Sequence, residues 1–185
     1  IVKEANNWYS TFSIEQLSSY PELNVSINKD KTIGIDVGLI DYYYDSKGNS
    51  KSAPRLLRLA EKSVKRLQRK LSECKKRSKE FYKTLKALQT AHSKVKYKRL
   101  DFLYKTAYEL FKDNELIVRE DLKLKNLIKR PKAKKDENDN YIPNGASAKS
   151  GMNKSFSDVS FGKFFDILEQ IANKLDKLVI KINPA

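Results

Sequence analysis

Hydrophobic and polar positions in residues 1–53 predict short strands. Aromatic and β-branched residues alternate with polar ones over residues 8–15, as in a half-buried strand. Residues 32–39 are mostly apolar, which indicates a buried strand. Residues 41–45 predict a second strand entering a hairpin turn, and residues 50–53 a short third. We therefore expect three antiparallel strands at the start of the core.

The segment after Pro54 has the spacing of two packed helices. Apolar residues recur from Leu56 to Cys74 in alternating steps of four and three, and the same steps run from Phe81 to Leu110. A polar stretch, residues 75–79, lies between the two runs. This pattern predicts a long antiparallel helical hairpin over residues 54–112.

The last third of the chain predicts two strands, a loop and a helix. Residues 116–120 and 177–182 have strand patterns, and a helix is expected to begin at residues 155–157 and to bury the apolar face that follows. Residues 129–155 carry too little apolar surface to offset the entropy of ordering, so we expect a flexible loop. Asp121 is expected to cap a short helical segment.

This order of elements predicts an α/β fold with a mixed sheet of the RNase H type. Such a core requires the strand of Glu120 to pair in parallel with the strand of Asp36. Residues 31–185 would form this main domain, with the helical hairpin inserted into it. Residues 1–30 are interpreted as the end of a preceding β-domain followed by a linker, because loop-forming residues precede the core.

Asp36 and Glu120 are the candidates for chemistry. Each is a carboxylate on a short apolar strand, where burial is costly unless a cation or hydrogen-bond donors compensate for the charge. Two such acids on neighbouring strands suggest one metal site, whose oxygen ligands favour Mg²⁺ or Mn²⁺ over zinc. Two divalent ions about 4 Å apart can activate water and stabilise the leaving oxygen in phosphodiester cleavage. The pattern predicts a metal-dependent nuclease.

The net charge of the chain indicates a nucleic-acid partner. A net charge of +15 favours a polyanion, and we expect nucleic acid rather than an anionic membrane surface. Cations dominate the exterior of the first predicted helix, where they could follow a phosphate backbone. The expected nucleic-acid-binding residues are Arg55, Arg58, Lys62, Lys65, Arg66, Arg69 and Lys70.

Two further observations restrict the class of protein. No stretch approaches the roughly 18 consecutive apolar residues of a membrane span, so we expect no membrane partner and an intracellular location. Cys74 is the single cysteine, which excludes internal disulfides and a Cys-based zinc site within the chain.

Residues 34–38, Gly-Ile-Asp-Val-Gly, also resemble the first phosphate loop of the actin and sugar-kinase ATPases. In those proteins small hydroxyl residues follow the second glycine, whereas Leu39, Ile40 and Asp41 follow here. The chain has only six glycines and no second glycine-rich loop, so this alternative is disfavoured.

Five motifs together resemble the TnpB/OrfB proteins of insertion-sequence transposons, which are related to the type V CRISPR nucleases. The resemblance extends from about Trp8 to Ala185. The motifs are Gly34-Ile35-Asp36-Val37-Gly38-Leu39, Leu67-Gln68-Arg69-Lys70-Leu71-Ser72, Glu120-Asp121-Leu122, Ser157-Asp158-Val159-Ser160-Phe161 and Lys181-Ile182-Asn183-Pro184-Ala185.

The resemblance implies an RNA-guided DNA endonuclease with a RuvC-like domain, in which a guide RNA pairs with target DNA. It also implies a cytoplasmic, nucleoid-associated location in a prokaryote. Asp36 matches the first RuvC carboxylate and Glu120 the second, both as metal ligands. The basic helix would lie against guide and target nucleic acid, and base pairing would supply most sequence recognition.

The chain also departs from the family pattern. The family's third catalytic aspartate follows a four-cysteine zinc ribbon beyond the Asn-Pro-Ala segment, so zinc is expected only downstream of this chain. Arg119 replaces a residue that is usually apolar, but alternation along a strand should turn it away from the metal side. We expect a fragment of a longer nuclease that is inactive alone. The alternative is a non-catalytic protein that binds nucleic acid or regulates transposition.

Overall fold

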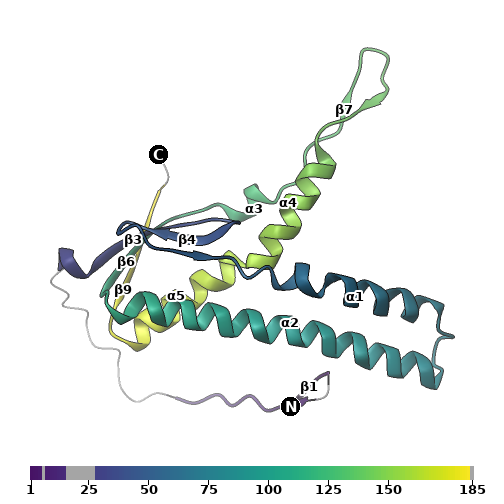
Figure 1. The fold of residues 1–185 in the computed structure, drawn as a ribbon, viewed down its shortest axis with the longest axis horizontal. Helices are drawn as coiled ribbons and strands as arrows, with labels where there is room; N and C mark the ends of the chain where they lie inside the picture. The colour runs from purple at the N-terminus through teal and green to yellow at the C-terminus, as the bar shows by residue number, and fades with distance from the viewer. Residues whose placement is uncertain (6, 16–27, 184–185) are drawn as a thin grey trace. The chain divides into compact units, whose positions relative to one another are not determined.

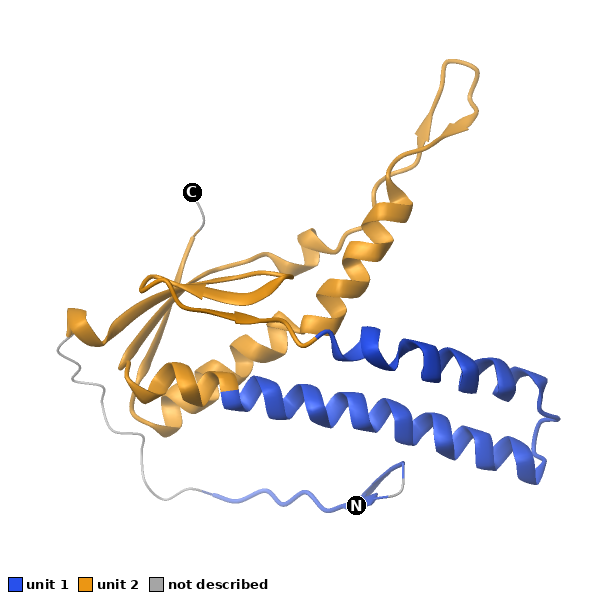
Figure 2. Ribbon diagram, viewed as in Figure 1, with its two compact units in different colours: residues 1–23, 55–105 blue, residues 24–54, 106–185 orange. Residues whose placement is uncertain are grey.

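The computed structural model describes residues 1–5, 7–15 and 28–183 in two compact units (Figure 2). Unit 1 comprises residues 1–23 and 55–105, and unit 2 comprises residues 24–54 and 106–185. The predicted linker between the N-terminal strands and the core falls largely on residues 16–27, outside the described residues. Only part of the predicted division at residue 30 can therefore be compared with the structure.

Unit 2 contains a five-stranded mixed sheet in the order β5-β4-β3-β6-β9 (Figure 1). Strands β3 (Thr32–Val37), β4 (Asp41–Asp45) and β5 (Ser50–Ser52) are antiparallel, as their hairpin pattern predicts. Strand β6 (Leu116–Glu120) pairs in parallel with β3, and β9 (Leu178–Ile182) pairs in parallel with β6. The predicted parallel neighbours are thus confirmed, and the mixed α/β architecture is compatible with an RNase H-type core.

The core of unit 2 lies between one face of this sheet and helix α5 (Phe161–Lys174). Apolar residues recur on one side of α5 and are buried, among them Phe164, Ile167 and Leu168. The Phe164 ring lies 5.1 Å from the ring of Tyr42, which is itself fully buried on β4. Packing between these rings couples the antiparallel part of the sheet to α5.

Replacing Phe164 by Ala should destabilise unit 2 by about 3–5 kcal/mol, because a fully buried ring is lost and a cavity remains. Denaturant unfolding followed by circular dichroism measures this loss. Ile40→Ala is the control, since Ile40 is an exposed apolar residue of the same unit and its loss should change stability by less than about 0.5 kcal/mol. Equal effects of the two substitutions would contradict the described core.

Unit 1 contains the two helices that the heptad spacing predicts. Helix α1 (Leu56–Glu73) and helix α2 (Lys79–Lys112) run in opposite directions in Figure 1, and α2 continues into unit 2. Their inward residues Val64, Thr84 and Val95 are buried. At the turn, Lys70 Nζ lies 2.6 Å from Glu80 Oε1. Strands β1 (Val2–Glu4) and β2 (Asn7–Tyr9) form a small antiparallel hairpin in the same unit.

The strand predicted over residues 8–15 is wrong beyond Tyr9. β2 ends there, and residues 10–15 are exposed and belong to no regular element. The alternation of aromatic and polar residues over this segment indicated one buried face, but Trp8 and Phe12 are both exposed. Without a buried face, alternation alone does not define a strand.

The helix start predicted at residues 155–157 is also wrong. Helix α4 (Ala146–Val159) begins earlier, and the predicted loop 129–155 contains its first residues as well as β7 (Lys134–Lys135) and β8 (Tyr141–Ile142). Ser160 separates α4 from α5 because its backbone has φ 54°, in the left-handed region. The sequence shows no glycine or proline at this break.

Asp121 does not cap a helix, contrary to the prediction. Helix α3 (Leu124–Leu127) begins after Lys123 and has no side-chain cap at its start. The Asp121 carboxylate instead pairs with the Lys123 ammonium. A 3₁₀ helix, η1 (Lys29–Lys31), precedes β3. None of the described helices is long and apolar enough to cross a membrane.

Candidate functional site

Asp36 and Glu120 lie side by side at the carboxyl ends of two adjacent parallel strands. Ile35 pairs with Arg119 in the β3–β6 register, and continuing that register by one residue sets Asp36 beside Glu120. Residues in register share a face of the sheet, so both carboxylates are on the same side. This edge of an open α/β sheet is where ligands commonly bind.

The burial of the two acids differs from the sequence-based expectation. Asp36 is exposed and Glu120 is half-buried, whereas the metal site was inferred from the cost of burying both acids. That premise is wrong for Asp36. What the structure supports is the other part of the inference, namely that two acids about eighty residues apart in sequence reach adjacent positions.

Arg119 fixes the end of β6 from the opposite face of the sheet. Its side chain is buried, at 5% exposure, and its guanidinium carbon lies 3.9 Å from the centroid of the Phe165 ring on α5. The guanidinium donates a 3.0 Å hydrogen bond to Glu169 Oε1 and another of 3.0 Å to the carbonyl oxygen of Glu120. Arg119 therefore points away from the face of Asp36, as strand alternation predicts.

Glu169 is a positioning residue that the sequence did not indicate. Its carboxylate accepts from Lys181 Nζ at 2.9 Å as well as from Arg119. The hydrogen bond from Lys181 has the largest effect on the pKa of Glu169 and lowers it. Burial opposes this effect, but with the added hydrogen bond from Arg119 the pKa stays below its ordinary value of 4.5. An unusual arginine on a buried strand is the signal that could have prompted a search for such a partner.

Glu169→Gln should cost about 1 kcal/mol of stability at neutral pH, since the pair is partly exposed on the Glu169 side. A folded-state pKa below the unfolded value means that the contribution is complete above pH 4.5 and is lost as pH falls through the lowered folded value. Unfolding free energies of both proteins between neutral and acidic pH should therefore converge at low pH. Glu109→Gln, which disrupts the Lys51–Glu109 pair, is the control. If the difference in unfolding free energy between Glu169→Gln and the unmodified protein stays constant down to low pH, the role of Glu169 is contradicted.

Gly38 and Tyr44 shape the edge of the sheet near Asp36. A Cβ at position 38 would lie 2.8 Å from the carbonyl oxygen of Asp41, so the tight β3–β4 turn requires glycine. Tyr44 pairs directly with Asp36 across the antiparallel β3–β4 ladder and therefore shares its face. It is 53% exposed, and its hydroxyl donates to Asp41 Oδ2 at 2.7 Å, which raises the pKa of Tyr44. The hairpin register could have identified Tyr44 from the sequence.

Other acids near this edge have structural contacts. Asp45 accepts hydrogen bonds from the backbone amides of Lys47 and Asn49, which fixes the β4–β5 turn. Asp41 accepts from Tyr44 and Ser52. Within residues 1–5, 7–15 and 28–183, no three His, Cys, Asp or Glu side chains gather as a group that could hold a metal ion. Asp36 and Glu120 fit the oxygen chemistry of Mg²⁺ or Mn²⁺, but they provide only part of a ligand set.

The basic face of α1 is a second candidate site, and all seven residues predicted for it are exposed; six lie on α1, and Arg55 directly precedes the helix. Two of the seven have acidic partners, since Lys65 pairs with Glu61 and Lys70 pairs with Glu80. Among the described residues, Lys62, Arg66 and Arg69 have no carboxylate oxygen within 4 Å of their charged nitrogens. These three line a shallow hollow of about 620 Å³ together with Leu59, Ser63 and Lys65.

Comparison with known proteins identifies relatives over most of the chain. The chain is 27% identical over 174 residues to a candidate RNA-guided DNA endonuclease, InsQ, of Escherichia coli strain K12, covering 94% of this chain and 40% of InsQ. It is 30% identical over 100 residues to a candidate RNA-guided DNA endonuclease of Streptomyces pristinaespiralis, covering 54% of this chain and 25% of that protein. The chain thus spans less than half of the length of either relative.

The family model OrfB of the IS605 type, described as a probable transposase, matches residues 17–130. This match includes both the Asp36 and Glu120 strands and the whole of α1 and α2. It covers more than half of the chain and includes three of the five motifs on which the resemblance to TnpB/OrfB proteins rests, those at residues 34–39, 67–72 and 120–122. The chain therefore belongs to the OrfB family of insertion-sequence transposon proteins.

Proposed function

We propose that this chain is the part of an RNA-guided, metal-dependent DNA endonuclease that carries two of its catalytic carboxylates and a nucleic-acid-binding helix. The observation that carries this proposal is the placement of Asp36 and Glu120 on one face, at the ends of adjacent parallel strands. The strand order supports a RuvC-like domain of the RNase H type, in which α1 and α2 would be an insertion between β5 and β6.

In this proposal Asp36 and Glu120 hold divalent cations, Mg²⁺ or Mn²⁺, through their carboxylate oxygens. Bound cations would supply an activated water and charge stabilisation for the leaving oxygen. The residues of the chain position this site: Arg119 and Glu169 fix the backbone at Glu120, and the Gly38 turn fixes the strand end after Asp36. Exposed Tyr44 stands on the same face, where it can contact a bound nucleic-acid strand.

The proposed partners are a guide RNA and a target DNA. The exposed cations of α1 would neutralise backbone phosphates, which supplies affinity without reading sequence. Sequence recognition would reside in base pairing between guide and target. The names of the two relatives support this assignment, since both describe RNA-guided DNA endonucleases.

A second function, non-catalytic binding of nucleic acid in transposition, is favoured by one observation. The described residues bring together two acidic side chains and no third at a possible metal site. Under the first function, the same observation leads us to expect that the 185-residue chain by itself does not cleave DNA, and that the complete protein supplies the remaining ligand and a zinc ribbon elsewhere.

Cleavage by the complete protein distinguishes the two functions. The protein is incubated with its guide RNA, a complementary or mismatched DNA duplex, and Mg²⁺, Mn²⁺ or a chelator. We expect cleavage only of the complementary duplex and only with a divalent cation. Guide binding without cleavage under every metal condition would instead support the non-catalytic function.

A further inference from the structure

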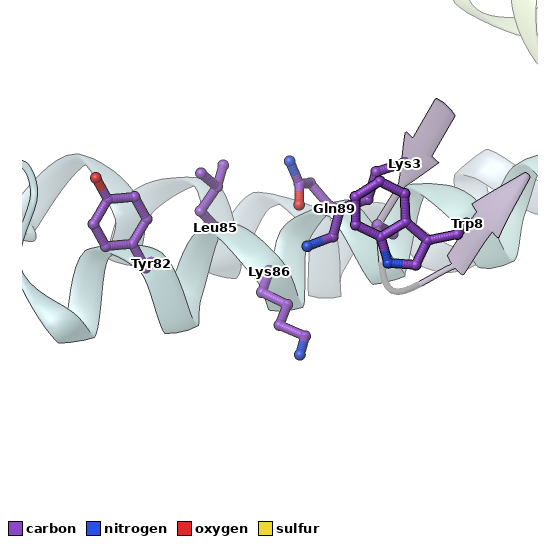
Figure 3. Close-up of a pocket in the computed structure, with 7 residues that line it drawn as sticks. Lys3, Trp8, Tyr82, Leu85, Lys86 and Gln89 are labelled. Carbon is purple, nitrogen blue, oxygen red and sulfur yellow. The ribbon is translucent and has the colours of Figure 1, made fainter. Parts of the chain in front are cut away.

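A second hollow in unit 1 combines exposed aromatic rings with lysines. It has a volume of about 460 Å³ and is lined by Trp8 and Lys3 of the N-terminal hairpin and by Tyr82, Lys86 and Gln89 of α2 (Figure 3). Trp8 is 67% exposed and Tyr82 57% exposed. Large aromatic side chains usually lie in cores, so two exposed rings at one hollow indicate a binding surface.

The N-terminal hairpin is held on α2 by polar contacts within the unit. Lys96 Nζ contacts the two carboxylate oxygens of Glu4 at 2.7 and 2.8 Å, and the hydroxyls of Tyr9 and Tyr97 are hydrogen-bonded to each other. Both contacts are made by adjacent residues of α2, Lys96 and Tyr97, and the Trp8 indole lies near Gln89 in Figure 3. The hairpin that carries Trp8 is therefore anchored to α2 next to the hollow.

The chemistry of this hollow matches an unpaired nucleotide. Every nucleobase has a π-face that can stack on an indole or phenol ring, and such stacking tolerates any base. Lys3 Nζ lies over one face of the Trp8 ring, 5.1 Å from its centroid, so a base would stack on the opposite face of the indole with this positive charge across the ring. Lys86 adds a second cation for the adjacent phosphate, and the Gln89 amide can both donate to and accept from a base edge.

We propose that the hollow between Trp8 and Tyr82 binds an unpaired nucleotide of single-stranded nucleic acid, with the base on Trp8 and the phosphate at Lys3 and Lys86. This inference rests on the nucleic-acid binding in the proposed function and adds a separate site to it. The α1 cations contact backbones irrespective of pairing, whereas a stacking site requires an unpaired base.

Trp8 is the single tryptophan of the chain, so its fluorescence reports on this site alone. The 185-residue chain is titrated, without metal, with short single-stranded RNA, single-stranded DNA and duplex DNA, while anisotropy of a labelled strand measures binding separately. We expect single strands to quench Trp8 emission and bound duplex to leave it unchanged. Comparison of the RNA and DNA arms shows which strand the site prefers. Full binding of single strands without change in Trp8 emission would overturn the proposal.

Substitutions separate stacking from charge. Trp8→Leu should weaken single-strand binding about 5- to 100-fold with an unchanged salt slope, and Trp8→Phe should retain most of the affinity. Lys86→Gln should reduce the slope of log affinity against log salt by about 0.7. Tyr104→Ala is the matched control, because Tyr104 is an exposed ring of α2 that does not line the hollow.

The outcomes distinguish this site from the proposed function. If Trp8→Leu has no effect while charge reversal on α1 removes binding, the stacking site is wrong and the proposed function stands. If the chain binds neither single strands nor duplex, the nucleic-acid part of the proposed function fails together with the stacking site. Circular dichroism of each variant establishes that the helices are retained.

Discussion

Asp36→Asn is expected to reduce guided DNA cleavage by the complete protein by about a thousandfold or more, while RNA binding changes by less than about twofold. The reason is that a metal ligand contributes several kcal/mol of charge stabilisation to the transition state, whereas an exposed carboxylate contributes little to folding. Cleavage rates at saturating Mg²⁺, together with guide affinity by filter binding, measure the two effects separately.

Glu120→Gln provides the partner experiment. If both acids serve one metal site, the double variant should cleave no more slowly than the slower of the two single variants, because residues that act as a unit have non-additive effects. Asp166→Asn is the matched control, an identical change at an exposed carboxylate of α5 in the same unit. A parallel loss of RNA binding and cleavage in Asp36→Asn would show that this acid is structural.

Charge reversal along α1 is expected to have the second largest effect. Changing Arg58, Lys62, Arg66 and Arg69 to Glu should weaken duplex binding by two or more orders of magnitude, because the contacts of these cations with phosphates are lost. Each lost contact should reduce the slope of log affinity against log salt concentration by about 0.9. The measurement is duplex affinity by anisotropy at salt concentrations from about 50 to 200 mM. Both the affinity and the slope should fall.

The control for this experiment keeps the net charge of the variant. Four exposed lysines of α2 are reversed in the control, namely Lys79, Lys83, Lys94 and Lys98. The two variants carry the same net charge, so any difference in their duplex affinity is due to the location of the cations. An unchanged salt slope in the α1 variant would show that this face of α1 does not contact nucleic acid.

Much of the framework around the candidate site could be predicted because it depends on local patterns. The buried run of β3 and the hairpin signals at β4 and β5 predicted the antiparallel strands, and heptad spacing predicted both long helices. Parallel pairing of β3 with β6 followed from the order of elements. The adjacency of Asp36 and Glu120 was therefore predictable, although the exposure of Asp36 was not.

The remaining features depend on tertiary contacts that leave weak traces in sequence. Ser160 ends α4 in a left-handed conformation without a glycine, and the apolar face of α5 stabilises that break. Asp121 could have capped a helix, but Lys123 provides a competing partner. The Arg119–Glu169 pair joins strand and helix across fifty residues, so the sequence indicates the unusual arginine but not which acid pairs with it.

The most direct test of the central claim is whether Asp36 and Glu120 bind one cation. Mn²⁺ is titrated into the isotopically labelled chain, and paramagnetic broadening of backbone amide signals is followed by nuclear magnetic resonance. We expect signals around Asp36 and Glu120 to broaden together at the same Mn²⁺ concentration, and Glu120→Gln to remove the broadening at Asp36. Broadening at one strand that persists without the other acid would contradict a shared metal site.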